Sequence, residues 1–133
     1  MHATIHGERT LTELDFARLT KRLHGRIPSE LADLLAATEV VGSRLVPADV
    51  VTMYSQVELI ALDTRRRQTL TICYPEDAEP AAGFISVLSP VGTSLLGLKA
   101  GSTARWCTPS GEEGSAELAA ILFQPEASGD YTS

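Results

Sequence analysis

The clearest structural signal in the sequence is Ile85–Ser86–Val87–Leu88–Ser89–Pro90–Val91–Gly92–Thr93–Ser94–Leu95–Leu96–Gly97. Its apolar beginning predicts a strand over residues 84–88. Ser89 is a favourable N-cap, and Pro90 suits the first position of a helix, because an N–H group there would have no partner within the helix. Gly97 is placed to end that helix after one or two turns. The segment therefore predicts a strand followed at once by a short helix.

Further strands are predicted on both sides of this segment. Residues 50–62 are rich in β-branched and apolar side chains, and residues 68–74 show an alternation that puts Leu70, Ile72 and Tyr74 on one side. A turn at 63–65 would join them into a hairpin. Residues 103–108 and 117–123 predict two more strands. Strands joined by short turns favour a mainly antiparallel sheet with one helix packed on it, which is an α+β fold.

The first 46 residues predict two short helices. Thr10 and Thr12 are each followed three residues later by an acidic residue, which is the spacing of a capping box. Gly25 and Pro28 predict the turn between the helices, and apolar residues at helical spacing continue from 27 to 41. We therefore expect a short antiparallel helical hairpin that is marginally stable alone.

Composition changes at Pro47, which suggests a division into two parts. Residues 1–46 would form the helical hairpin, and residues 47–133 would form the sheet domain. The domain would end in a polar tail, residues 124–133, that is expected to be loosely held.

Composition and charge narrow the function classes. Apolar residues make up 44% of the chain and charged residues 21%, as in soluble globular proteins. No apolar run approaches the roughly 20 residues that span a bilayer, and residues 1–10 lack the apolar core of a signal peptide. We therefore expect a cytoplasmic protein, with a polar surface typical of a monomer. The net charge of −6 argues against tight, autonomous binding of nucleic acid.

The sequence predicts no catalytic residue, metal site or cofactor. Cys73 and Cys107 lack the spacing of a zinc site and are predicted to be buried thiols in a reducing compartment. There is no glycine-rich phosphate loop, and no serine or cysteine lies beside a credible base.

Three motifs in the same order resemble a known family. They are Asp49–Val57, the strand-to-helix segment from Ile85 to Leu98, and the ending Gln124–Tyr131. They look like the C-terminal domain of the GreA/GreB family of transcript-cleavage and elongation factors, and within it like the branch of regulators of nucleoside diphosphate kinase. The resemblance spans about residues 47–131. It implies an FKBP-like β-sheet domain preceded by an antiparallel helical hairpin.

The resemblance also implies a partner, RNA polymerase. Gre factors insert a long hairpin into the secondary channel of the polymerase, where acidic residues at its tip help to hold a catalytic magnesium ion. Their C-terminal domain docks on the rim of that channel. The branch with a shortened hairpin binds polymerase without stimulating cleavage. By this resemblance the docking residues here are Ser89, Pro90, Val91 and Leu95, and the protein is a regulator rather than an enzyme.

The sequence departs from the family pattern in two places. Gly101–Ser102 stands where the family often has Gly-Asp, and the predicted hairpin turn, residues 24–29, carries no carboxylate. Glu30 and Asp33 are the alternative acidic tip, because carboxylates at i and i+3 share a helix face and could hold magnesium. The other reading is that they are first-turn acids stabilised by the helix dipole.

Other functions also stay open at this point. Residues 65–67, three consecutive arginines, indicate either a solvated turn or a patch for an acidic surface or for nucleic acid near the polymerase. Direct binding to nucleoside diphosphate kinase is a further alternative. Prolyl isomerase activity, known among FKBP-like domains, is the least favoured alternative. It needs a pocket lined with aromatic side chains, whereas Tyr74, Trp106 and Phe123 are expected in the core.

Overall fold

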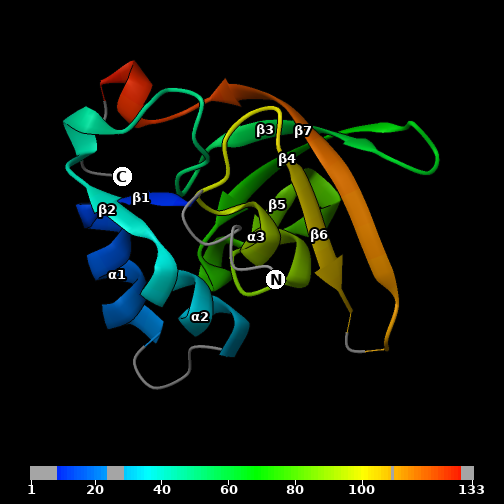
Figure 1. Ribbon diagram of the computed structural model, residues 1–133, viewed down its shortest axis with the longest axis horizontal. Coiled ribbons are helices and arrows are strands. Elements are labelled where there is room, and N and C mark those ends of the chain that lie inside the picture. The colour runs from blue at the N-terminus through cyan, green and yellow to red at the C-terminus, as the bar shows by residue number, and fades with distance from the viewer. Residues whose placement is uncertain (1–8, 24–28, 109, 130–133) are drawn as a thin grey trace.

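The computed structural model describes residues 9–23, 29–108 and 110–129 (Figure 1). Two short strands and two helices come first: β1 (Thr10–Thr12), α1 (Glu13–Leu23), α2 (Ser29–Ala37) and β2 (Glu39–Val41). The sheet domain follows with β3 (Gln56–Ala61), β4 (Arg67–Cys73), β5 (Phe84–Ser86), α3 (Pro90–Leu95), β6 (Thr103–Cys107) and β7 (Glu113–Phe123). The predicted α+β class is confirmed. Within the described residues, none of the helices combines the length and apolar character needed to span a bilayer.

The main sheet has five strands in the order β5-β4-β3-β7-β6. All neighbouring pairs are antiparallel except β4 and β5, which run parallel. The predicted alternation in β4 is confirmed at Leu70 and Ile72, which are buried in the core. Side chains also shape the predicted turn between β3 and β4, because Thr64 N donates to Asp63 Oδ1 at 2.7 Å.

The N-terminal segment differs from the prediction at two points. Thr12 is the residue that caps α1, since its Oγ1 accepts from Asp15 N at 3.0 Å, whereas Thr10 lies in β1. The second helix ends at Ala37, so the prediction of helix up to residue 41 is wrong. Residues 39–41 pair instead in parallel with β1, and two adjacent β-branched valines favour that strand. The predicted turn around Gly25 and Pro28 lies outside the described residues.

The helices and the sheet share one hydrophobic core. Leu11, Leu19 and Leu31 from the first 46 residues are completely buried in the same cluster as Met53 and Leu118 from the sheet domain. Figure 1 shows α1 and α2 at one end of the molecule, with the sheet and α3 beside them. The division between residues 46 and 47 remains a proposal. The shared core means that the two parts bury apolar surface against each other.

A buried polar cluster joins both ends of the chain to the segment that precedes β3. The Asp15 carboxylate, from α1, accepts a hydrogen bond from Met53 N at 3.0 Å. Glu126, which follows β7, accepts one from Thr52 Oγ1 at 2.7 Å. Both acids are almost completely buried. A buried carboxylate is tolerated only with such partners, so these bonds fix the register between the termini and the sheet.

The expectation of a loosely held tail is wrong for residues 124–129. Gln124 is buried, and its Nε2 donates to the carbonyl oxygens of Pro47 at 2.8 Å and Val50 at 2.7 Å. Glu126 opens a short 3-10 turn, residues 126–128. Polar composition misled the prediction, because the Gln124 amide donates to backbone carbonyl groups and the Glu126 carboxylate accepts from Thr52 instead of facing water.

The prediction of two buried thiols holds for one cysteine. Cys73 is buried, and burial raises the pKa of its thiol, with further contributions from Asp77 and Glu76. Cys107 is exposed, because it lies on the outward face of β6 with Thr103 and Arg105.

Removing residues 1–44 tests the proposed division. We expect the fragment 45–133 to unfold cooperatively, because its sheet is complete, but at a lower temperature than the whole chain, because four leucines leave the core. Thermal unfolding followed by circular dichroism measures both. A fragment without a cooperative transition would contradict a separate sheet domain.

The second prediction concerns pH. Burial raises the pKa of Asp15 from 3.8 to about 7; the neighbouring Glu126 raises it further, and hydrogen bonds from Met53 and Thr12 together with Arg18 oppose the shift. The folded state therefore binds this proton more tightly than the unfolded chain, so the stability that Asp15 contributes is fully present below about pH 4 and is lost as the pH rises through about 7. The free energy of unfolding should fall by roughly 2–3 kcal/mol between pH 5 and pH 8 from this group alone.

Denaturant titrations at several pH values measure this slope. The substitution Asp15→Asn should flatten it, and Asp33→Asn, at an exposed position of α2, serves as the control for loss of one carboxylate. An unchanged slope in Asp15→Asn would assign the pH dependence to other groups.

Candidate functional site

The start of α3 is held rigidly by its own side chains. Ser89 Oγ accepts from Gly92 N at 3.1 Å and donates to the carbonyl oxygen of Ser86 at 2.7 Å. Ser89 is thus the N-cap and Pro90 the first helical residue, as the sequence predicted. The capping hydroxyl links the helix to the end of β5, so the residues between strand and helix have little freedom to move.

Gly92 allows α3 to lie directly against the backbone after β5. A Cβ atom at this position would lie 2.1 Å from the Ser86 carbonyl oxygen, which no side chain tolerates. The next residue, Thr93, donates from its Oγ1 to the Val87 carbonyl oxygen at 2.7 Å. No structural role was predicted for Gly92 from the sequence. The signal available was a glycine inside a helix, where it is unfavourable unless a close contact requires it.

The other end of α3 is tied to the N-terminal segment. Arg9 Nη1 donates to the Leu96 carbonyl oxygen at 2.8 Å, which places a cation at the negative end of the helix. Gly97 adopts φ +80°, as its predicted role in ending the helix requires, and its carbonyl oxygen accepts from Thr10 N at 3.1 Å. Sequence reasoning missed Arg9, because it is separated from the helix by more than 80 residues.

The structure brings Ser89, Pro90 and Val91 together as a half-buried surface. Leu95 differs, because it is completely buried and packs in the core. It has no exposed area to offer a partner, so its contribution is to anchor the helix that carries the other three residues.

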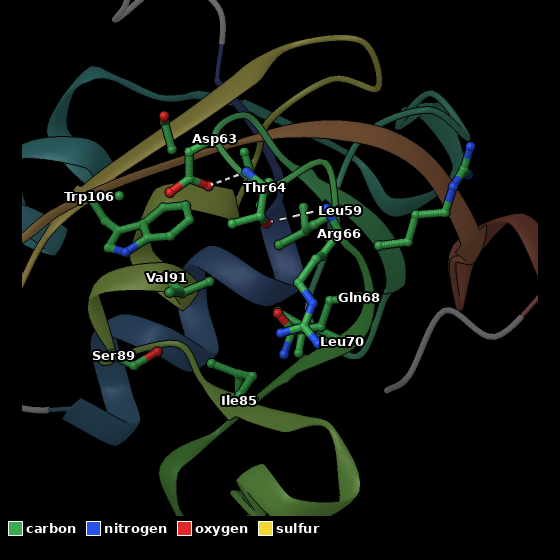
Figure 2. Close-up of a pocket in the computed structure, with 15 residues that line it drawn as sticks. Leu59, Asp63, Thr64, Arg66, Gln68, Leu70, Ile85, Ser89, Val91 and Trp106 are labelled. Atoms are coloured by element: carbon green, nitrogen blue, oxygen red, sulfur yellow. Dashed lines mark hydrogen bonds between the residues drawn. The ribbon is translucent and has the colours of Figure 1, made fainter.

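A pocket of about 670 Å³ lies beside this surface. Apolar side chains from the sheet, from β5 and from α3 make its floor and walls, and the β3–β4 hairpin forms its rim (Figure 2). Ser89 and Val91 are among the lining residues, together with Leu59, Ala61, Asp63, Thr64, Arg66, Arg67, Gln68, Leu70, Ile85, Trp106, Gly114, Ser115 and Ala116. The candidate site is therefore the outer part of a larger hollow.

Trp106 forms one end of the pocket. Its ring packs on the strand β7 at Gly114, where a Cβ atom would lie 2.4 Å from Cε2 of the indole. Figure 2 shows the ring facing Val91 across the pocket. The expectation of a core residue is confirmed for Tyr74, which is buried, and in part for Trp106, which is half-buried and packs against the core. It is wrong for Phe123, which is 47% exposed.

The β3–β4 hairpin supplies the charged rim. Arg67 pairs with Glu58 at 3.1 Å, and Arg65 adopts φ +61° at the turn. Arg66 lies between them and lines the pocket. The three arginines therefore have three different environments, which their sequence could not indicate.

The acidic alternative, Glu30 and Asp33, lies in α2, and Asp33 is exposed. Figure 1 shows α2 next to α1 at the helical end of the molecule. At about 1.5 Å per residue, α1 with 11 residues and α2 with 9 residues extend only about 16 and 14 Å.

Comparisons with known proteins agree with this architecture. The family model described as transcription elongation factor, GreA/GreB, C-term matches residues 46–122, which include α3 and nearly all of the five-stranded sheet. The chain is 39% identical over 85 residues to the regulator of nucleoside diphosphate kinase of Escherichia coli (strain K12), covering 64% of this chain and 62% of that protein.

Further relatives extend the similarity. Transcription elongation factor GreA of Acidiphilium cryptum (strain JF-5) is 36% identical over 101 residues, which is 76% of this chain and 63% of that protein. The chain thus spans a little over three-fifths of the length of these two relatives. A solved structure of a prokaryotic GreA/GreB elongation factor from Nitrosomonas europaea superposes with a TM-score of 0.71 at 31% identity, over 86% of this chain and 99% of that chain.

The last comparison covers 86% of this chain, which is more than residues 47–133 alone, and the predicted α+β fold with a Gre-type C-terminal domain is confirmed. The family model covers more than half of the chain and contains the whole surface formed by Ser89, Pro90 and Val91. This chain therefore belongs to the GreA/GreB family of transcription elongation factors.

Proposed function

We propose that this protein binds RNA polymerase at the rim of the secondary channel and regulates transcription without stimulating transcript cleavage. The observation that carries the proposal is the rigid start of α3, held by Ser89 and Gly92 within the matched domain. In the family that the sequence resembles, this strand-to-helix segment meets the polymerase.

The geometry of the surface supports a role in binding. The residues at Ser89, Pro90 and Val91 are already ordered, so little conformational entropy is lost when a partner binds. Val91 offers apolar area, and the hollow beside it can receive a side chain. Leu95 is not included in the proposed contact surface, because it is buried.

The shortness of the helices supports the second half of the proposal. Helices of about 16 and 14 Å cannot extend far into a channel from a domain docked at its rim. The residues of the predicted hairpin turn, 24–28, lie outside the described residues, and their sequence holds no carboxylate. On this proposal the protein has no catalytic activity of its own and acts in the cytoplasm, beside the polymerase.

Nucleoside diphosphate kinase is the competing partner, because a relative at 39% identity is named as a regulator of that enzyme. Binding assays with purified polymerase and with purified kinase separate the two. Binding to the kinase alone would replace the proposed function.

The first prediction here concerns cleavage. Added to backtracked polymerase complexes, the protein should release no short 3′ RNA fragments, whereas a cleavage-active Gre factor in the same assay should. Release of fragments that disappears in the double variant Glu30→Ala with Asp33→Ala would contradict the proposal and establish a Gre-type cleavage function.

The second prediction concerns the docking surface. Val91→Asp places a charge in an apolar contact, so it should weaken polymerase binding by about 2 kcal/mol, which is roughly 30-fold in Kd. Val40→Asp is the matched control, because Val40 is 40% exposed on β2, outside the proposed surface, and it should leave the Kd unchanged. Melting temperatures of both variants show whether they are folded.

Competition gives an independent measurement of the same surface. A Gre factor should displace this protein from polymerase, since both would occupy the channel rim. Simultaneous saturation of the polymerase by both proteins, or normal binding by folded Val91→Asp, would exclude the proposed surface.

A further inference from the structure

The pocket beside Val91 combines an apolar interior with a polar rim. Leu59, Leu70 and Ile85 line it from the sheet, and Val91 and Trp106 line it from two sides. A volume of about 670 Å³ lies within the range of pockets that bind ligands or anchor side chains of a partner. An apolar hollow at the edge of a docking surface is where a single buried side chain contributes most to affinity.

Arg66 is the charged group that distinguishes this pocket. Figure 2 shows its side chain descending from the hairpin, with the guanidinium group beside Gln68 and Leu70. Among the described residues, no carboxylate lies within the 4.0 Å of an ion pair with Arg66, whereas the adjacent Arg67 pairs with Glu58 at 3.1 Å. A planar guanidinium group is suited to bind a carboxylate through two parallel hydrogen bonds.

Arg67 also lines the pocket but is paired with Glu58, and Asp63 lies away from the Arg66 guanidinium group. Asp63 is at the opposite end, beside Trp106, where its carboxylate accepts from Thr64 N (Figure 2). A second hollow that shares Trp106 adds Arg105 and Glu113, one charge of each sign. The Gln68 end of the pocket is therefore positive, although the whole chain carries a net charge of −6.

We infer that the pocket receives one apolar side chain of an acidic segment of RNA polymerase, and that Arg66 pairs with a carboxylate next to that side chain. The inference rests on the proposed function and adds the chemistry of the contacted segment. One unpaired guanidinium group beside an apolar hollow matches a peptide with adjacent apolar and acidic residues. A nucleic acid would require several cations along its backbone, and Asp63 and Glu113 would repel its phosphates.

The affinity of the whole protein for core RNA polymerase tests the charge. Arg66→Glu and Arg65→Glu change the net charge equally on the same hairpin, but only Arg66 lines the pocket. We expect Arg66→Glu to raise the Kd at least tenfold and Arg65→Glu less than about threefold. The Arg66→Glu defect should persist when the ionic strength is raised, because a contact in a pocket is screened less than exposed charges are.

Filling the pocket tests its apolar part independently of charge. Ala61 lines the pocket and is half-buried, so Ala61→Phe should occupy the space that the partner needs. We expect a Kd at least tenfold higher and a melting temperature within a few degrees of the parent. If Ala61→Phe does not fold, Arg66→Glu decides the inference, since Arg66 is exposed.

The outcomes separate this inference from the proposed function. If the unaltered protein does not bind polymerase, the proposed function fails. If it binds, and Arg66→Glu and Arg65→Glu weaken binding equally and only at low salt, the attraction is long-range and the pocket is not the contact. Normal binding by folded Ala61→Phe would likewise overturn the inference while leaving the docking surface at Val91 intact.

Discussion

The close approach of α3 to the backbone after β5 is the constraint on which the remaining structure depends. It requires a glycine at position 92, because any Cβ atom there would collide with the Ser86 carbonyl oxygen. Once the helix lies this close, Ser89 and Thr93 can bond to the carbonyl groups of the same segment. The helix then carries Leu95 into the core and leaves Val91 at the surface, so a single packing contact positions both the core and the candidate site.

The same helix also connects the sheet to the N-terminal segment. Arg9 binds the carbonyl group at the C-terminal end of α3, and β1 lies against Gly97. In addition, Asp15 in α1 accepts a hydrogen bond from Met53, and Glu126 after β7 accepts one from Thr52. The helices are therefore bound to the sheet by buried polar contacts as well as by leucines. A protein built in this way holds its short helices in one orientation relative to the proposed docking surface.

The candidate site owes its character to the meeting of three separate segments. Val91 comes from α3, Trp106 from β6 and Arg66 from the β3–β4 hairpin. Local sequence alone does not bring these three residues together. Together they make an apolar hollow with a positive rim on an acidic protein, which is a surface able to discriminate among partners by charge as well as by shape.

By itself the sequence determined the α+β class, the hairpin of β3 and β4, and the capped start of α3. These features depend on local patterns: alternation in the strands, Ser89 before Pro90, and a glycine at the end of the helix. The family followed from motifs that combine such patterns, and the comparisons confirm it. Three features could not be predicted from local patterns: the pairing of β1 with β2, the burial of Gln124 and Glu126, and the burial of Leu95.

Only the tertiary structure decided those features, because each depends on contacts between residues far apart in the chain. Residues 39–41 become a strand since β1 is available as a partner, and Gln124 is buried since the carbonyl groups of Pro47 and Val50 need a donor. Arg66 differs from Arg65 because it lines the pocket, and from Arg67 because Arg67, which also lines the pocket, pairs with Glu58. Local sequence fixes the conformational preference of a segment. Packing decides which partner satisfies a buried group and which charge is left exposed.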